Sequence, residues 1–383
     1  MQNEILLSQK LLKIPSFSGF NAEIIEFIAD FLTKIGFKCD ILNYEGDGSY
    51  KVNNLHAIYN PKSSTKTLYF AGHTDVVATG DLKAWRYDPF AAKIVGDKLF
   101  GRGAADMKCA IACFMQAACE FITKNPQPNF GIGFLITNDE ENDSINGTKK
   151  VLQWMKNRFP ISACIVGEPT NPQFLGEMLK IGRRGSINFE VKIIGKQGHV
   201  AYPQSAINPN TTMVNLLQIL KNHKFDEGNE FFSPTNLEIT NICSENLGNN
   251  VISSIVIANF NVRFNSLQTA QTIIDLVDYS CKKTVLVLGS QYELNYKTSG
   301  EAFLSKKSEF ADLVQNSVAK ITGKTPIFST VGGTSDARFI KDYCQNVIEF
   351  GLINDTAHKI DEFAFLEDIK KLQEIYSEIL RKF

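Results

Sequence analysis

The chain has 383 residues, and its 40 Lys and Arg side chains nearly balance 41 Asp and Glu, for a formal net charge of −1. A hydrophobic fraction of 44% is enough for a large buried core and excludes wholesale disorder. The near-neutral charge gives no reason to expect binding to nucleic acid or to an anionic membrane surface. At about 150 residues per domain, the length indicates two or three domains.

The cysteines and the N-terminus favour a protein of the reducing cytoplasm. None of the eight cysteines forms a C-x-x-C pair, and Cys113 and Cys164 lie in apolar runs, where buried thiols are expected. The N-terminal segment MQNEILLSQK lacks the basic and apolar regions of a signal peptide. No run of roughly 18 apolar residues, the length that a membrane-spanning helix needs, occurs in the sequence.

The N-terminal part of the chain alternates helix and strand patterns. Residues 21–36 have apolar side chains at helical spacing, residues 68–72 (LYFAG) predict a buried strand, and residues 104–124 predict a buried helix. The alternation continues with a strand at 130–138, a helix at 145–158 and a strand at 161–167. Such alternation is typical of an α/β sheet with helices packed on its faces.

The pattern changes near Arg183. The next elements are a half-buried strand at 186–194, a helix at 210–223, strands at 237–243 and 251–264, and a helix at 269–284. From about Leu294 the α/β style resumes, with a strand at 347–350 and an amphipathic helix over the last 20 residues. We therefore expect an α/β domain formed by residues 1–182 and 296–383, interrupted by an α+β module at 183–295.

Acidic and histidine side chains follow the predicted strands or begin the predicted helices. They are His73 and Asp75 after the strand at 68–72, Asp106 at the start of the next helix, Glu140 and Glu141 after the strand at 130–138, and Glu168 after the strand at 161–167. Open α/β sheets place their ligands at the carboxyl ends of strands. Each segment alone also has an ordinary reading, as a structural histidine, a helix-terminal carboxylate or an acidic surface loop.

Taken together, these residues indicate a pair of divalent metal ions. With His358 near the C-terminus, the set offers two imidazoles and three carboxylates, those of Asp106, Glu141 and Glu168. Nitrogen and oxygen ligands without thiolate suit Zn, Mn or Co better than a structural site built from cysteine. Two divalent ions would also balance the negative charge of the carboxylates.

Nine segments in order along nearly the whole chain carry a family resemblance. They are GHTDVV, the GD of TGDLKAW, GRGAADMK, TNDEE, VGEPT, GRRGS, QGHVAYP, GGTSDARF and HKIDE. Together they resemble the family of dizinc aminoacylases and carboxypeptidases, and GRRGS, QGHVAYP, NNVI and GGTSDARF are similar to the desuccinylases of that family. The resemblance implies a zinc-peptidase-like catalytic domain with a mixed sheet flanked by helices, interrupted by a ferredoxin-like dimerisation domain.

The resemblance also implies a ligand set for two metal ions, most consistent with Zn²⁺, with Co²⁺ or Mn²⁺ as alternatives. Asp106 resembles the carboxylate that bridges both metals. His73 and Glu168 resemble the other ligands of one metal, and Glu141 and His358 those of the second.

By the same resemblance, Glu140 is the general base and Asp75 the partner that orients His73. His199 resembles a residue that reaches across a homodimer to stabilise the oxyanion. The implied reaction is hydrolysis of N-succinyl-LL-2,6-diaminopimelate to succinate and LL-2,6-diaminopimelate, a step of lysine and diaminopimelate biosynthesis. The alternatives are an acetylornithine deacetylase, a general aminoacylase or carboxypeptidase, or an inactive binding protein.

A substrate with three carboxylates requires cationic and amide donors, and arginine suits bidentate capture of a carboxylate. The resemblance suggests these substrate-binding residues: Arg183, Asn249, Asn250, Arg263, Ser299, Gly333, Thr334 and Tyr202, with Arg338 as a weaker candidate. Arg263 and Arg338 are equally readable as solvated surface charges. Cys109 stands where the family usually has glycine, which suggests a thiol sensitive to oxidation near the metals.

Two further histidines, His56 and His223, match no motif. We expect them to be ordinary residues of a strand and a helix.

Overall fold

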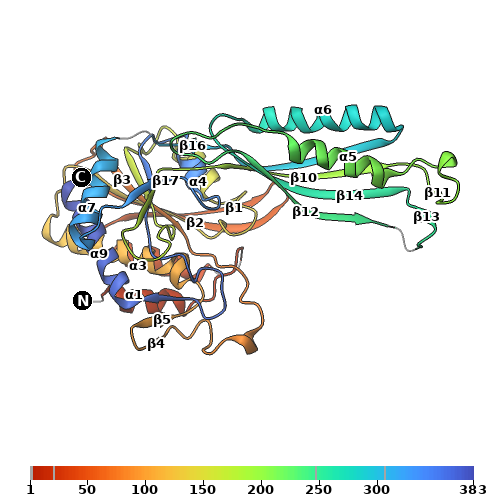
Figure 1. Cartoon of the computed structure of the whole chain (residues 1–383). Coiled ribbons are helices and arrows are strands. Elements are labelled where there is room, and N and C mark those ends of the chain that lie inside the picture. The colour runs from red at the N-terminus through yellow and green to blue at the C-terminus, as the bar shows by residue number, and fades with distance from the viewer. Residues whose placement is uncertain (1–2, 20–21, 246–247, 306–307) are drawn as a thin grey trace. The chain divides into compact units, whose positions relative to one another are not determined.

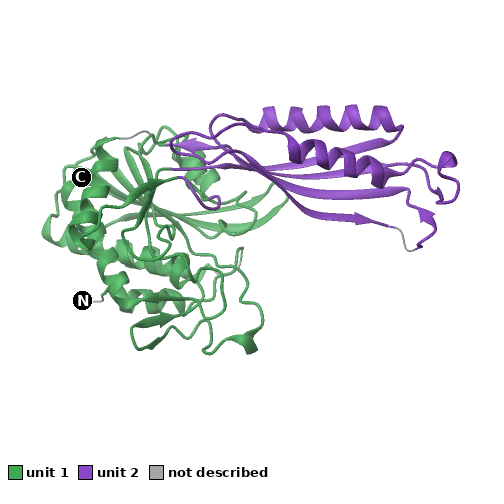
Figure 2. Ribbon diagram, viewed as in Figure 1, with its two compact units in different colours: residues 1–181, 305–329, 335–383 green, residues 182–304, 330–334 purple. Residues whose placement is uncertain are grey.

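The computed structural model describes residues 3–19, 22–245, 248–305 and 308–383 (Figure 1). The chain divides into two compact units, coloured separately in Figure 2. Unit 1 contains Met1–Ile181, Ser305–Ser329 and Ser335–Phe383, and unit 2 contains Gly182–Leu304 and Thr330–Thr334.

Unit 1 is built on an eight-stranded mixed sheet in the order β1-β2-β6-β3-β7-β18-β8-β17. The strands are β1 (Lys38–Gly46), β2 (Ser49–Tyr59), β3 (Thr67–His73), β6 (Gly131–Thr137), β7 (Ala163–Val166), β8 (Met178–Lys180), β17 (Ile327–Ser329) and β18 (Val347–Glu349). At its centre β3 runs parallel to both β6 and β7, whereas β2 is antiparallel to β6. Helices cover both faces of the sheet, so the side chains of the central strands β6 and β7 are buried throughout. Such strands are apolar along their length instead of alternating with polar residues.

The helices of unit 1 are α1 (Glu4–Leu12), α2 (Glu23–Lys34), α3 (Cys109–Lys124), α4 (Thr148–Met155), α7 (Glu309–Thr322), α8 (Ala337–Ile340) and α9 (Leu366–Lys382). One face of the sheet packs on α3, where the ring of Phe114 stacks at 4.7 Å from that of Phe70. On the opposite face, His56 of β2 contacts the ring of Trp154 in α4. Alternation along β2 therefore separates the main core from a smaller one under α4.

A three-stranded sheet in the order β19-β5-β4 lies in the same unit. It consists of β4 (Lys93–Val95), β5 (Lys98–Phe100) and β19 (Phe363–Phe365), with Phe363 opposite Phe100. This antiparallel pairing brings the chain just after His358 beside the chain just before Asp106.

Unit 2 has a four-stranded antiparallel sheet, β12-β14-β10-β15, covered by two helices. Its elements are β10 (Gly185–Ile194), α5 (Pro209–Asn222), β12 (Asn236–Ser244), β14 (Ile255–Phe264), α6 (Ala270–Leu288) and β15 (Gln291–Gly300). Every second residue of β10 from Ile187 to Ile193 is buried, and these side chains belong to the same apolar cluster as those of α5 and α6. The βαββαβ order is that of a ferredoxin-like module, so the expected fold class is confirmed.

Two short strand pairs complete unit 2. They are β9 (Gly182–Arg183) with β16 (Phe303–Leu304), and β11 (Gly198–His199) with β13 (Val251–Ile252). The domain boundary expected between residues 295 and 296 falls inside β15. The expected return to the α/β style near Leu294 is therefore wrong, because β15 pairs with β10 from Ser186 to Ile194.

The structure corrects two further elements. The helix expected from residue 104 begins at Cys109, since Asp106 and Met107 have non-helical backbone angles. The strand expected at 251–264 is interrupted at residues 253–254, where the Ser253 side chain bonds to Ile255. The sequence patterns also did not reveal α1, α7 or the long hairpin of β1 and β2.

No helix among the described residues is long and apolar enough to cross a membrane.

The buried His56 predicts a specific dependence of stability on pH. Its ring contacts Asp40 at 3.2 Å and the Tyr69 hydroxyl at 3.1 Å, and burial lowers its pKa although Asp40 opposes that shift. In the unfolded chain a histidine takes up its proton near pH ~6.5. The contribution of His56 to stability is therefore complete above that pH and is lost as the pH falls through the lower folded-state pKa.

We expect the urea midpoint of the parent chain to fall more between about pH 8 and about pH 5 than that of His56→Gln. The control is His223→Gln, which changes an exposed histidine. Equal pH dependence of the parent and His56→Gln would contradict the prediction.

Candidate metal centre

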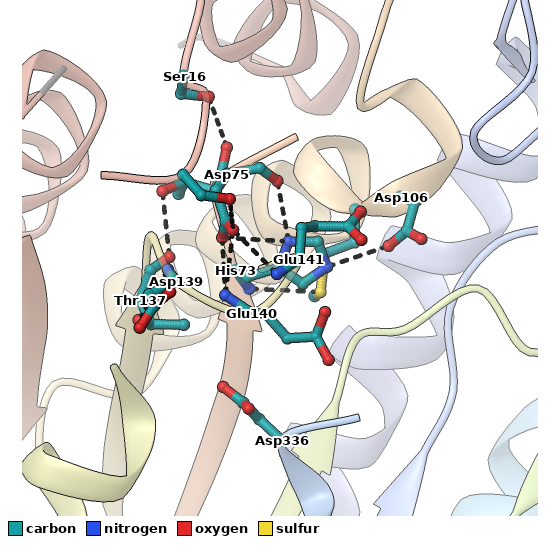
Figure 3. A network of polar contacts seen from close by, with 12 residues as sticks. Ser16, His73, Asp75, Asp106, Thr137, Asp139, Glu140, Glu141 and Asp336 are labelled. Atoms are coloured by element: carbon teal, nitrogen blue, oxygen red, sulfur yellow. Dashed lines mark hydrogen bonds and ion pairs between the residues drawn. The ribbon is translucent and has the colours of Figure 1, made fainter. Parts of the chain in front are cut away.

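Asp106 lies between two histidines and offers one carboxylate oxygen to each (Figure 3 shows His73). Its Oδ1 is 3.1 Å from Nε2 of His73, and its Oδ2 is 3.3 Å from Nε2 of His358. A carboxylate held in this way is suited to bridge two cations, one on each side.

Each side of Asp106 has one more carboxylate. Oε1 of Glu168 is 3.7 Å from Nε2 of His73, and Oε1 of Glu141 is 2.9 Å from Nε2 of His358. The result is two groups of three possible metal ligands, within each of which the ligand atoms lie within 4.8 Å of one another. The groups are His73, Asp106 and Glu168, and Asp106, Glu141 and His358.

The sheet explains why these residues meet. His73 ends β3, while Glu141 and Glu168 follow β6 and β7, the two parallel neighbours of β3. Parallel neighbours end at the same edge of a sheet, so three ligands separated by many residues converge there. Asp106 and His358 come from the two segments that the β5–β19 pairing holds together.

Asp75 connects the first histidine to the adjacent turn. Nδ1 of His73 is 3.0 Å from the Asp75 carbonyl oxygen and 3.6 Å from its carboxylate. This contact leaves Nε2 of His73 facing the ligand group, as a metal-binding imidazole requires. The Asp75 carboxylate also accepts hydrogen bonds from the backbone N–H groups of Glu140 and Glu141 and from the hydroxyl of Ser18.

The three consecutive acids after β6 have three different environments (Figure 3). Asp139 accepts hydrogen bonds from the Tyr50 hydroxyl and from the backbone N–H groups of Ser144 and Asn146. Glu141 contacts His358. Glu140 is the middle acid of the three in sequence. Burial raises its pKa well above the ordinary range, with a further contribution from the charge of Glu168.

The charges of the centre fit divalent metals. Burial alone would raise the pKa of Asp106, but hydrogen bonds with His358 and His73 hold it well below its usual value. Hydrogen bonds with Asp106 and Glu141 raise the pKa of His358 to about 10. Burial would lower the pKa of His73, but hydrogen bonds with Asp106 and Asp75 raise it well above its usual value. Metal ligands bind in their deprotonated forms, so bound divalent cations would supply the positive charge that these carboxylates require.

Asp336 is a buried carboxylate that the sequence did not reveal. Burial raises its pKa to about 6, and it lies near Glu140 (Figure 3), whose pKa it also raises. Arg338 is not a solvated surface charge, because Nη2 approaches Asp336 at 3.9 Å and the guanidinium is largely buried. The only signal for Asp336 was its place in the GGTSDARF segment.

Glu362 and Arg102 form a buried ion pair beside the centre, with Nη1 of Arg102 2.8 Å from the carboxylate. Their segments, HKIDE and GRGAADMK, carry the family resemblance, but that resemblance implies no role for Glu362 or Arg102.

The expectation that Cys109 is sensitive to oxidation is wrong. Its side chain belongs to the main apolar core, and burial raises the thiol pKa to about 12. The reactive thiolate is therefore disfavoured.

Unit 2 brings several of the predicted substrate residues together in two places. The β11–β13 pair joins His199 to Val251, and the carbonyl of Asn250 accepts a hydrogen bond from Val200, so Asn249 and Asn250 lie beside the His199 segment. Tyr202 places its ring 5.7 Å from that of His199.

Arg183 is buried, and its guanidinium donates a 2.7 Å hydrogen bond to the carbonyl oxygen of Gly333, next to Thr334. Arg263 is half-buried on β14, opposite Ser186 of β10. Ser299 lies near the end of β15.

Comparison with known proteins agrees with this architecture. Residues 69–382 match the model of "Peptidase family M20/M25/M40". The chain is 45% identical over 382 residues to a "Succinyl-diaminopimelate desuccinylase" of Pelagibacter ubique (strain HTCC1062), an alignment that covers 100% of this chain and 99% of the relative.

Two solved structures are similar in fold. The M20 family metallo-carboxypeptidase Sso-CP2 of Sulfolobus solfataricus has a TM-score of 0.80 at 18% identity, over 100% of this chain and 99% of that one. The YXEP protein of Bacillus subtilis, described as a dinuclear metal binding peptidase, has a TM-score of 0.72 at 15% identity, over 98% and 96% of the two chains. With the family match over most of its length, the chain belongs to peptidase family M20/M25/M40.

Proposed function

We propose that the chain is a metal-dependent amidohydrolase that converts N-succinyl-LL-2,6-diaminopimelate to succinate and LL-2,6-diaminopimelate, in lysine and diaminopimelate biosynthesis. The observation that carries the chemistry is the pair of ligand groups that share Asp106, with Glu140 beside them. The choice of substrate is supported by full-length similarity to relatives named succinyl-diaminopimelate desuccinylase.

The proposed cofactor is a pair of divalent ions in each chain. One ion would be held by His73, Asp106 and Glu168, and the other by Asp106, Glu141 and His358. Imidazole and carboxylate donors without thiolate favour Zn²⁺, and Co²⁺ or Mn²⁺ also suit such a set.

Each acidic side chain has a separate task in the proposed reaction. Divalent ions held by these residues would lower the pKa of a water molecule and polarise the carbonyl of the amide. Glu140 takes the proton that the water releases and later delivers it to the leaving amine. Asp75 keeps His73 in the tautomer that exposes Nε2.

Substrate recognition is assigned to the polar residues of unit 2. His199 would donate a hydrogen bond to the oxyanion, and cationic and amide groups would bind the substrate carboxylates. The proposed substrate residues are Arg183, Asn249, Asn250, Arg263, Ser299, Gly333, Thr334 and Tyr202.

We also propose a homodimer in which His199 acts in the site of the neighbouring subunit. Apolar side chains on the outer surfaces of α5 and α6 support an interface formed by unit 2. They include Val214, Ile219 and Tyr279, and above all Leu286 and Val287, which are 84% and 82% exposed. Exposed apolar groups of this kind are typical of protein–protein contacts.

A cytoplasmic location is supported by the cysteines, since all eight are free thiols.

The bridging carboxylate predicts a pattern of metal loss. Asp106→Asn removes a ligand of both ions, so we expect metal content after dialysis to fall well below that of Glu141→Gln or Glu168→Gln, each of which should lose about one ion. Elemental analysis of the purified variants measures this. Glu367→Gln, at an exposed position of α9, should retain the parental content. Two ions in Asp106→Asn would contradict the shared-ligand arrangement.

The proposed substrate predicts a ranking of kcat/KM, with N-succinyl-LL-2,6-diaminopimelate above N-acetylornithine. A preference for the acetylated substrate would instead support an acetylornithine deacetylase.

In the same assay, Glu140→Gln should lower kcat by about 10²–10⁴-fold, because the general base is lost while the metal ligands remain. Full activity of this variant would exclude Glu140 as the base.

Action of His199 across the dimer predicts complementation. His199→Ala and Glu140→Ala chains should each be nearly inactive alone, but mixed dimers should recover activity in the one site that combines an intact His199 with an intact Glu140. The assay is activity after joint refolding, with each refolded variant alone as the control. If mixed dimers form without any gain, His199 does not act in trans.

A further inference from the structure

Glu362 is an almost fully buried carboxylate, 1% exposed, with an unusual number of donors around it. Oε2 accepts hydrogen bonds from the Arg102 guanidinium at 2.8 Å and from the backbone N–H of Gly103 at 3.1 Å. Oε1 accepts from the N–H groups of Ala105 at 2.9 Å and Asp106 at 3.2 Å. One side chain thus binds the backbone of the segment that ends in the bridging carboxylate.

Arg102 extends this network to the segment of the second histidine. It is buried, and Nη1 also donates to the carbonyl oxygen of Lys359, the residue after His358, at 3.1 Å. Nη2 donates to the carbonyl of Ala78 at 3.3 Å, and the guanidinium lies 5.2 Å from the ring of Trp85. The ion pair therefore contacts the chain next to two metal ligands, Asp106 and His358.

The backbone reinforces the same connection. The carbonyl of Glu362 accepts a hydrogen bond from Gly101 at 2.9 Å, directly beside the pairing of β5 with β19. The Thr356 hydroxyl donates to the carbonyl of Phe363 at 2.7 Å, which closes the loop around His358.

The two ligand groups differ in how they depend on this network. His73 ends a central strand, is buried, and is oriented by Asp75. His358 lies in a loop, has a positive φ of 64°, and is 49% exposed. The contacts of Glu362 and Arg102 therefore add to the β5–β19 pairing in fixing the distance between His358 and Asp106.

Stabilisation of the fold alone does not account for the arrangement of the Glu362–Arg102 pair. A buried ion pair is often no more stabilising than apolar residues of the same shape, because both charges lose their hydration. The acceptors and donors here are instead matched to a non-helical backbone at Asp106, which must leave both carboxylate oxygens free to face the two histidines.

We propose that Glu362, paired with Arg102, is a positioning residue that sets the affinity of the Asp106–Glu141–His358 metal site more than that of the His73–Asp106–Glu168 site. This inference rests on the proposed metal-dependent function.

The test is Glu362→Gln, which keeps the shape and one acceptor oxygen but removes the charge that faces Arg102. Stepwise Zn²⁺ titration of the chelator-treated chain by calorimetry should show one of the two sites losing about 10–100-fold in affinity, with a much smaller change at the other, and the His358→Gln background identifies which site is affected. Arg102→Lys should shift the same site in the same direction, because lysine cannot reproduce the fork of donors.

Two controls separate positioning from general damage. Asp355→Asn changes a carboxylate of the same loop that is 72% exposed and, among the described residues, contacts only the exposed Lys359 side chain, so it should leave both affinities unchanged. In a chain that already carries His358→Gln, adding Glu362→Gln should have little further effect on the remaining metal site, because both changes act on the Asp106–Glu141–His358 site.

Equal losses at both sites, or parental affinities in Glu362→Gln, would overturn the inference while leaving the proposed function intact. A parent chain that binds fewer than two ions would overturn both.

Discussion

The negative charge gathered around Asp106 is the constraint on which unit 1 depends. Three carboxylates and two imidazoles meet there from five distant parts of the chain. Carboxylates at these distances repel one another in a poorly hydrated site unless positive charge separates them. The parallel strands β6, β3 and β7 supply three of the five residues at a single edge, and the small β5–β19 pairing supplies the other two.

The adjacent acids after β6 bind different partners because the backbone directs their side chains apart. Asp139 points to Tyr50 and to backbone N–H groups, and Glu141 points to His358. The Asp75 carboxylate holds the N–H groups of Glu140 and Glu141, so the turn that separates them is tied to the strand of His73. The same network that orients a metal ligand therefore also places the proposed base.

The sequence predicted those parts of the fold in which burial leaves a strong pattern. β6 and β7 are apolar throughout, and the acids after them were recognised as site residues. Strand β1 has no comparable pattern, because none of its side chains is fully buried. The start of α3 was misplaced because Glu362, more than 250 residues away, binds the backbone N–H groups of Ala105 and Asp106. Contacts of that range leave no local signal, which also explains why Glu362 and Asp336 received no role.

The division of the chain into two units separates the proposed metal ligands and base from the proposed substrate and oxyanion contacts. Every proposed metal ligand and the proposed base belong to unit 1, where the sheet and the Arg102–Glu362 pair hold them. His199 and the proposed substrate residues belong to unit 2, where Arg183 is bonded to Gly333 and the His199 segment to Asn250. Each set is organised by contacts within its own unit. Metal affinity should therefore be governed by unit 1 alone, and changes to the polar residues of unit 2 should act on substrate binding and turnover without releasing metal.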